Sequence, residues 1–196
     1  MKQEELDIIL ENHEKWLWGK GGKKADLSNT ELKNTNLRLI NLKLADLSNA
    51  DLRGANLRGA NLSNADLRGA DLRGADLSNT GLRDASLKDA DLSNAYLRGA
   101  NLSNADLNWV NWQRVGGLTT IAVQVDTSRR NNQITYIKEL DIWITGCFQG
   151  TLAELKAAVE QTHKHNEKLK KRYYRVIDFI LNEVAEQCVS IARMTL

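Results

Sequence analysis

The sequence contains no proline and only two cysteines, and neither sign of charge dominates its 196 residues. It has 27 basic and 25 acidic side chains, so the composition indicates neither a polyanion binder nor a polyanion mimic. No run of about 18 apolar residues is present, which argues against a transmembrane helix. The opening MKQEELDIILENHEKW is too acidic for a secretory signal peptide, so we predict a cytoplasmic protein without membrane contact.

The two cysteines, Cys147 and Cys188, do not form a recognisable motif. They lie 41 positions apart, without the CxxC spacing of a metal site. In a cytoplasmic protein we expect two reduced thiols, although the sequence leaves open whether they form a disulfide. Because proline is absent, the turns of the chain must be made by glycine and asparagine.

A five-residue repeat occupies the centre of the chain. Leucine occurs at every fifth position from Leu27 to Leu107, which makes 17 leucines in one register. A small residue, usually alanine, stands two positions before each leucine except Leu42, where Ile40 takes its place. A period of five fits neither an α-helix nor a flat strand, because neither could place all the leucines on one face. It does fit a square coil in which each unit forms one side and four units form one turn.

The second residue after each leucine predicts the corners of this coil. Glycine and asparagine adopt positive φ at the lowest cost, which a tight turn after each short strand requires. One of the two stands at Asn29, Asn34, Asn49, Gly54, Gly59, Asn64, Gly69, Gly74, Asn79, Asn94, Gly99 and Asn104. Residues that are four units apart are therefore expected to stack in columns.

The units ADLSN, ADLRG, ANLRG and ANLSN resemble the pentapeptide-repeat family, whose consensus is A-(D/N)-L-x-x. The resemblance covers residues 25–115. It implies an all-β solenoid, a right-handed quadrilateral β-helix of about 4.5 coils with leucine and alanine inside. Since cyanobacteria are rich in this family, the resemblance also favours a protein of cyanobacterial type.

The charges outside the coil bear on one function of the family. Members that act on DNA gyrase, a type II topoisomerase, resemble duplex DNA through a strongly acidic surface. Here residues 25–115 contain 11 acidic and 11 basic side chains, and opposite charges cancel beyond about 10 Å in physiological salt. We therefore expect a solvated surface with short ion pairs, and the DNA-mimic modulator remains an alternative. The arginine-rich sides leave open a contact with an acidic partner or with phosphates, but only Tyr96 lies among the arginines, so direct nucleic-acid binding is not indicated.

Residues 1–24 predict an N-terminal capping helix and a hinge. From residue 3 to about 18, an apolar stripe is formed by Leu6, Ile9, Leu10, His13, Trp16 and Leu17. The following KGGKK would let this helix cover the open end of the coil. We expect His13 to be a boundary residue of the stripe rather than a ligand. Ile40 departs from the small-residue pattern, and Leu39 and Leu44 depart from the corner pattern; all three are expected to pack against the cap.

Residues 116–196 predict a C-terminal α+β module. Before this module begins, Trp109 and Trp112 are expected to close the last coil. The segments TTIAVQV, ITYI and ELDIWITGC predict two or three antiparallel strands. Thr151, with Glu154 three residues later, predicts a capping box at the start of a helix whose apolar stripe is Leu152, Leu155 and Val159.

A second helix is expected after the polar stretch HKHNEKLKKR. Its apolar face is formed by Tyr173, Val176, Ile177, Ile180, Val184, Cys188 and Ile191. The segments ITGCFQGTLAELKAAV and YYRVIDFI are similar to a small α+β module that accompanies pentapeptide repeats in some bacterial and phage proteins. That similarity implies no activity and adds no site.

The sequence predicts no catalytic, cofactor-binding or metal-binding residue. The candidates besides the cysteines are His163 and His165, which would point to different sides of a helix, and the trio Glu160, His163 and Glu167, which is typical of a polar surface. No glycine-rich phosphate loop, nucleophile elbow or paired-acid motif is present. An enzyme site in the module would need His163 or Cys147 buried in a cleft.

We therefore expect a non-catalytic scaffold or protein-interaction protein that displays a rigid β-helical surface. Its partner is expected to be another protein, and no cofactor is implied. The sequence leaves open whether the chain forms a homodimer. It also leaves open whether the C-terminal module is only a cap or the element that recognises the partner.

Overall fold

The computed structural model describes residues 1–125, 133–145 and 148–194, without the side chains of 124, 133 and 186–194. The chain divides into two compact units, Met1–Leu118 and Thr119–Leu196, and each is described by itself. Within the described residues, no helix is both long enough and apolar enough to cross a bilayer.

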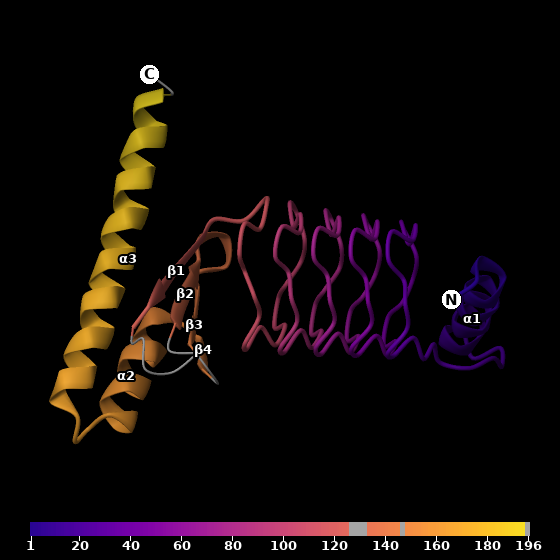
Figure 1. The fold of residues 1–196 in the computed structure, drawn as a ribbon, viewed down its shortest axis with the longest axis horizontal. Helices are drawn as coiled ribbons and strands as arrows, with labels where there is room; N and C mark the ends of the chain where they lie inside the picture. The colour runs from indigo at the N-terminus through magenta and orange to yellow at the C-terminus, as the bar shows by residue number, and fades with distance from the viewer. Residues whose placement is uncertain (126–132, 146–147, 195–196) are drawn as a thin grey trace. The chain divides into compact units, whose positions relative to one another are not determined.

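The first unit contains a coil held together by parallel β-bridges between residues of successive coils, such as Asp26 with Asp46 (Figure 1). The Leu27 N–H donates to the Asp46 carbonyl at 2.7 Å, and the Asp46 N–H donates to the Ala25 carbonyl at 3.0 Å. The structure thus confirms that four repeats form one coil. Each side contributes a single bridge residue, and the strands of the described chain all lie in the second unit.

The bridges form four columns, which we call sides 1 to 4. Side 1 begins with residues 25–29, side 2 with 30–34, side 3 with 35–39 and side 4 with 40–44. Each side continues with the equivalent repeat of every following coil, and sides 1 and 2 extend to 105–109 and 110–114, respectively. A side is therefore a surface made of segments that are far apart in the sequence.

Leucine and alanine fill the inside of the coil, as predicted. All 17 leucines of the register are at most 1% exposed. Burial of each leucine stabilises the coil by about 2 kcal/mol as an upper bound. Thr80 stands where most repeats have alanine, and its buried hydroxyl donates to the Leu57 carbonyl at 2.8 Å, so the polar group does not weaken the core.

All twelve predicted corner residues have positive φ, which confirms the turn assignment. Leu39 and Leu44 share this conformation, with φ of 60° and 67°. The prediction that these two leucines pack against the cap is wrong, because they are 69% and 39% exposed. A corner turns the side chain away from the coil, and Leu39 lies over Gly59 of the next coil instead.

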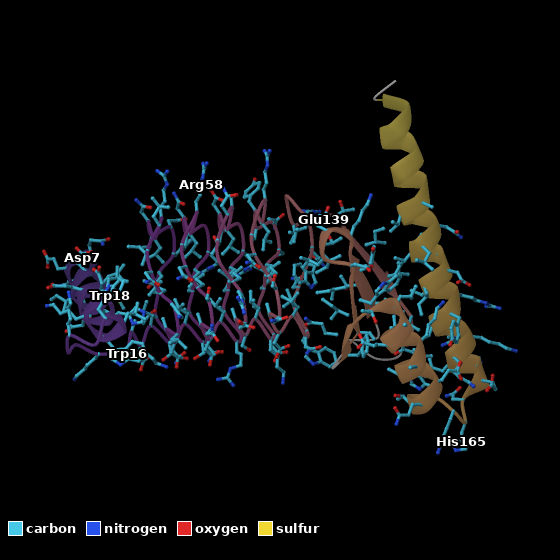
Figure 2. The ribbon with its side chains drawn as sticks, turned by 180° about the vertical axis from the view of Figure 1, so that it is seen from behind. Asp7, Trp16, Trp18, Arg58, Glu139 and His165 are labelled. Carbon is cyan, nitrogen blue, oxygen red and sulfur yellow. The ribbon has the colours of Figure 1, made fainter. Side chains whose placement is uncertain are left out.

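Helix α1 (Gln3–Leu17) lies at the N-terminal end of the coil (Figures 1 and 2). The predicted helix is confirmed, but His13 is not a boundary residue. His13 is fully buried, its ring stacks on Trp16, and its Nδ1 accepts a hydrogen bond from the Ala25 N–H at 3.0 Å. The imidazole therefore joins the helix to the first residue of the coil.

The burial of His13 lowers the pKa of its imidazole below the ordinary 6.5. The charge of Lys24 acts in the same direction, whereas the Lys43 carbonyl raises the pKa. Among the described residues, Nε2 has no hydrogen-bond partner of normal geometry. The neutral form, with the proton on Nε2, fits this site because Nδ1 must remain an acceptor.

The second unit contains one antiparallel sheet in the order β1 (Thr120–Gln124), β2 (Gln133–Ile137), β3 (Ile142–Thr145) and β4 (Phe148–Gly150). A 3₁₀ turn, η1 (Lys138–Leu140), occupies the beginning of the predicted third strand. Two or three strands were expected. Strand β4 was missed because three residues that include a glycine carry no readable alternation.

Two helices complete this unit. The capping box of α2 (Leu152–Thr162) is confirmed, since the Thr151 N–H donates to Glu154 Oε2 at 2.8 Å. Helix α3 (Glu167–Met194) begins within the stretch that was predicted to precede it, because Asn166 Oδ1 accepts from the Leu169 N–H at 3.0 Å. The buried core consists of Val125, Ile134, Tyr136, Trp143, Leu155, Val159, Tyr173, Ile177 and Ile180.

Cys147 and the side chains of Cys188 and Ile191 lie outside the described residues, so the pairing of the thiols and the place of Cys188 and Ile191 on the apolar face stay predictions. Trp112 occupies the leucine register and is buried, whereas Trp109 stands at a corner with φ of 63° and is half-buried.

The corner conformation predicts opposite effects for two substitutions. Leu39→Asn should raise the free energy of unfolding by about 1 kcal/mol, because a left-handed residue other than glycine or asparagine is strained. Asn64→Leu, at a corner with φ of 58°, should lower it by about the same amount. Urea unfolding of both variants checks this, and changes of the same sign would contradict the explanation.

The His13 site predicts that the helix cap weakens in mild acid. The folded-state pKa lies below the ordinary 6.5, so the contribution of His13 is complete above pH 6.5 and is lost as the pH falls through the folded-state pKa. Urea unfolding between pH 7.5 and 5 should show this loss in the wild type and in the exposed-site control His165→Gln. His13→Gln should lack the dependence, and its persistence there would refute the assignment.

Candidate interaction surface

Most of the aspartate and asparagine side chains that precede a core leucine accept a hydrogen bond from the backbone of their own turn. Asp46 Oδ1 accepts from the Ser48 N–H at 2.9 Å, and Asn56 Oδ1 accepts from the Arg58 N–H at 3.2 Å. The same contact, in which a side-chain oxygen accepts from the N–H two residues later, recurs along the coil. Asp91 Oδ1, for example, accepts from the Ser93 N–H at 2.9 Å. Aspartate and asparagine are suited to this turn because the side-chain oxygen is at the right distance from the backbone.

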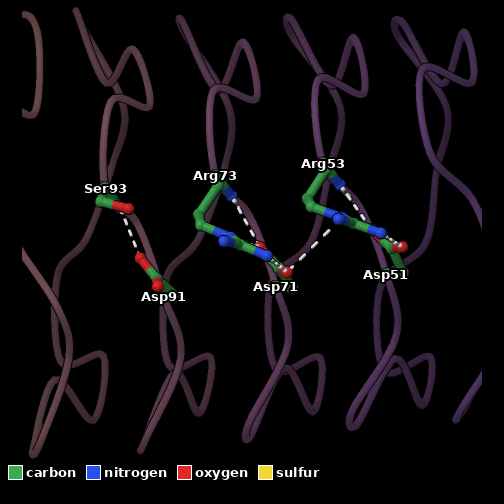
Figure 3. A network of polar contacts seen from close by, with 6 residues as sticks. All are labelled: Asp51, Arg53, Asp71, Arg73, Asp91 and Ser93. Atoms are coloured by element: carbon green, nitrogen blue, oxygen red, sulfur yellow. Dashed lines mark hydrogen bonds and ion pairs between the residues drawn. The ribbon is translucent and has the colours of Figure 1, made fainter.

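A ladder of polar contacts runs along side 2 (Figure 3). Its members are Asp51, Arg53, Asp71, Arg73, Asp91 and Ser93. Arg53 pairs with Asp51 of its own repeat, and its Nε lies 3.6 Å from Asp71 Oδ2 of the next coil. Arg73 Nε donates to Asp71 Oδ1 at 2.8 Å. The predicted short ion pairs are thus present, and one of them connects two coils.

The arginines of this ladder hold its carboxylates in the charged form. The hydrogen bond from Arg53 lowers the pKa of Asp51 to about 2, and the hydrogen bond from Arg73 lowers the pKa of Asp71. Because both members of each pair are partly exposed to water, the pairs contribute little to stability. These charges therefore define the surface more than they stabilise the coil.

Charge is distributed unevenly around the coil. Side 1 carries five acidic and two basic residues, side 2 four of each, side 3 one acidic and three basic, and side 4 one acidic and two basic. The charged residues of side 1 are Asp26, Asp46, Asp66, Asp89, Asp106, Arg68 and Lys88, and those of side 3 are Arg38, Arg58, Arg98 and Asp76. The zero net charge of the repeats therefore conceals an acidic side and a basic side.

A hollow of about 410 Å³ opens on side 3 and is lined by Arg58, Ser78, Asn79 and Arg98. The lining residues come from three successive coils. The hollow was not predicted, because it becomes visible only when the basic residues after each leucine are assigned to sides.

The candidate site residues of the second unit are His163, His165, Glu160 and Glu167, and the two histidines do not lie on a helix as expected. His163 and His165 lie at the end of α2 and in the following turn, not on a helix, and His163 stacks on Tyr173 at 5.1 Å between ring centroids. Glu160 accepts hydrogen bonds from Tyr174 Oη at 2.9 Å and from Lys170 Nζ at 3.2 Å.

These contacts connect α2 with α3. Lys170 also lies 2.5 Å from Glu167, so one lysine bridges both carboxylates of the predicted trio. The hydrogen bond from Tyr174 is the main cause of the lowered pKa of Glu160. In the part of the chain that the structure describes, no three histidine, cysteine or carboxylate side chains gather as metal ligands would.

Comparison with known proteins identifies the repeats. The family model described as pentapeptide repeats matches eight copies over residues 23–59, 40–79 and 77–111. A pentapeptide repeat protein from Nostoc is 45% identical over 50% of this chain and 74% of its own, with a TM-score of 0.24. The chain belongs to the pentapeptide-repeat family.

Two further pentapeptide-repeat structures are similar to this chain. Rfr23 from the cyanobacterium Cyanothece is 38% identical over 46% of this chain, with a TM-score of 0.46, and the chain spans only 63% of its length. A protein from the thylakoid lumen of Arabidopsis thaliana is 30% identical over 47% of this chain and 68% of its own, with a TM-score of 0.26. A comparison with curated proteins gives no match.

The ladder on side 2 predicts a small, pH-dependent effect. Asp71→Asn should lower the free energy of unfolding by at most about 1 kcal/mol near neutral pH. Because pairing lowers the pKa of Asp71 below 3.8, the difference from wild type should shrink as the pH falls below that value. Urea unfolding at pH 7 and pH 3 checks this.

Asp46→Asn is the matched control for this variant. Asp46 makes the same turn contact but forms no ion pair with a described residue. Its substitution should leave stability nearly unchanged at both pH values. Equal losses in the two variants would show that the carboxylates act through the turn and not through the arginines.

Proposed function

We propose that this pentapeptide-repeat protein is a non-catalytic interaction scaffold whose coil presents a rigid, charge-patterned surface to another protein. One observation carries the proposal. Many of the outward aspartate and asparagine side chains are bonded to their own backbone, and some carboxylates to arginines of the same or a neighbouring coil, as Asp71 is to Arg73 and Arg53, so these side chains are ordered before any partner arrives. Membership of the family supports it.

A preorganised surface suits this role for a physical reason. Binding loses free energy when side chains must be ordered, by about 0.5 to 1.5 kcal/mol for each flexible one. The coil has already ordered many of its polar groups through turns and ladders. The uneven charge of sides 1 and 3 would in addition orient an approaching partner of complementary charge.

The coil is taken as a right-handed quadrilateral β-helix over 25–115, with a cap in 1–24 and an α+β module in 116–196. The protein is taken as cytoplasmic, without a cofactor and without membrane or direct nucleic-acid contact. Family membership supports the handedness, and the close charge balance supports the exclusion of nucleic acid.

The acidic excess of side 1 favours a second candidate, a DNA-mimic modulator of a type II topoisomerase. Three aspartates, Asp26, Asp46 and Asp66, follow one another on this side. Arg68 contacts Asp66 at 2.5 Å, however, and Ser86 replaces the next aspartate. An interrupted acidic row produces a weaker field than a duplex, so the interaction scaffold is preferred.

The two candidates differ in a supercoiling assay. The scaffold predicts that the purified full chain leaves the activity of gyrase unchanged within twofold at micromolar concentration. Asp46→Lys combined with Asp66→Asn should then also have no effect. Inhibition or protection by the wild type that this double variant abolishes would replace the scaffold proposal with the DNA-mimic one.

The scaffold itself is tested by surface variants of the full chain in affinity purification from the native cells. A specific partner should be retained by the wild type and lost from a variant with reversed charges on one side only. Asp46→Lys with Asp106→Lys serves for side 1, and Arg38→Glu with Arg98→Glu serves for side 3. Retention of every captured protein by both variants would contradict a role for the coil surface.

A further inference from the structure

The outward row of side 3 reads Arg38, Arg58, Ser78 and Arg98 in successive coils. The serine stands where the other coils have an arginine, and its short side chain leaves the hollow described above. Arg58 and Arg98 border this hollow from opposite ends. They lie two coils apart, which is about 10 Å between their backbones.

The two arginines differ from the paired arginines of the other sides. A carboxylate lies within ion-pair distance of Arg53, Arg68, Arg73 and Arg83. Among the residues that the structure describes, neither the Arg58 nor the Arg98 guanidinium has such a partner. Arg58 is bonded through its backbone, whose N–H donates to Asn56 Oδ1. Figure 2 shows the Arg58 side chain directed outward from the coil.

The single carboxylate of side 3 does not neutralise the hollow. Asp76 Oδ1 accepts from the Ser78 N–H at 2.9 Å, and bonding to Ser78 is the main cause of the lowered pKa of Asp76. Arg58 lowers it less, through its charge alone. The Asp76 carboxylate is thus hydrogen-bonded within its turn, and the two guanidinium groups outnumber this one carboxylate, so the hollow keeps a positive charge.

We propose that the hollow on side 3 binds a phosphate group held between Arg58 and Arg98. A guanidinium presents a planar fork that matches two phosphate oxygens, and two forks on opposite sides of a hollow can hold one anion between them. Asn79, whose Oδ1 lies against Gly99, forms part of the same wall. The site does not depend on a protein partner, so it stands apart from the scaffold role.

The test is an NMR titration of the full chain with inorganic phosphate at pH 7, with the ionic strength held constant by sodium chloride. The side-chain Nε–H signals of Arg58 and Arg98 should shift in a saturable way in the millimolar range, and the Arg38 signal should not. A parallel titration with phosphoserine distinguishes the sources. Tighter binding of phosphoserine assigns a phosphorylated side chain, and tighter binding of inorganic phosphate assigns the free ion.

Variants separate a built site from general attraction. Arg58→Gln and Arg98→Gln should each weaken phosphate about tenfold, since each removes a charged hydrogen bond, whereas Arg38→Gln, the matched control on the same side, should weaken it less than about twofold. Ser78→Leu should abolish saturable binding by filling the hollow while both arginines remain. Thermal unfolding of each variant verifies folding.

Three results would overturn the proposal. Equal weakening by all three arginine variants would indicate attraction to the charge of the side alone. Unchanged affinity in Ser78→Leu would show that the hollow is not the site. Acetate that binds as tightly as phosphate would show that the arginines do not select a phosphate group.

Discussion

The coil depends on one constraint, which is that every fifth residue adopts the left-handed backbone conformation with positive φ. Each such residue turns the chain, so that leucine and alanine point inward and the peptide groups of each side point toward the neighbouring coils. The hydrogen bonds between coils, such as the one from Leu27 to Asp46, exist only because four corners return the chain to the side on which it began. The turn contacts of aspartate and asparagine reinforce this path.

The same constraint separates the inner residues from the outer ones. Because four sides share one narrow axis, the inside is filled by leucine and small residues, and chemical variety is confined to the outer positions. Those positions carry the ladder on side 2, the acidic excess on side 1 and the hollow on side 3. The first coil has no preceding coil to bond, and α1 lies at this end (Figure 1), joined to Ala25 through the buried imidazole of His13.

Sequence reasoning succeeded where local rules govern the structure. The period of four repeats per coil, the twelve corners and the Thr151–Glu154 capping box follow from spacing and turn chemistry. It failed where the outcome depends on contacts between distant residues, as with the burial of His13 against Ala25 or the exposure of Leu39. The start of α3 was a different failure, since Asn166 is a readable cap that the polar stretch around it concealed. The hollow between Arg58 and Arg98 required the charges to be assigned to sides.

The stacking of equivalent repeats has an evolutionary consequence. Insertion or deletion of four consecutive repeats lengthens or shortens the coil by one turn and keeps each later repeat on its side. Loss of a single repeat preserves the core but moves every later repeat to the adjacent side, and a loss between Arg58 and Arg98 would place these two residues on different sides. Selection for the outer surface should therefore tolerate changes in length by whole turns, even though the core alone would accept steps of a single repeat.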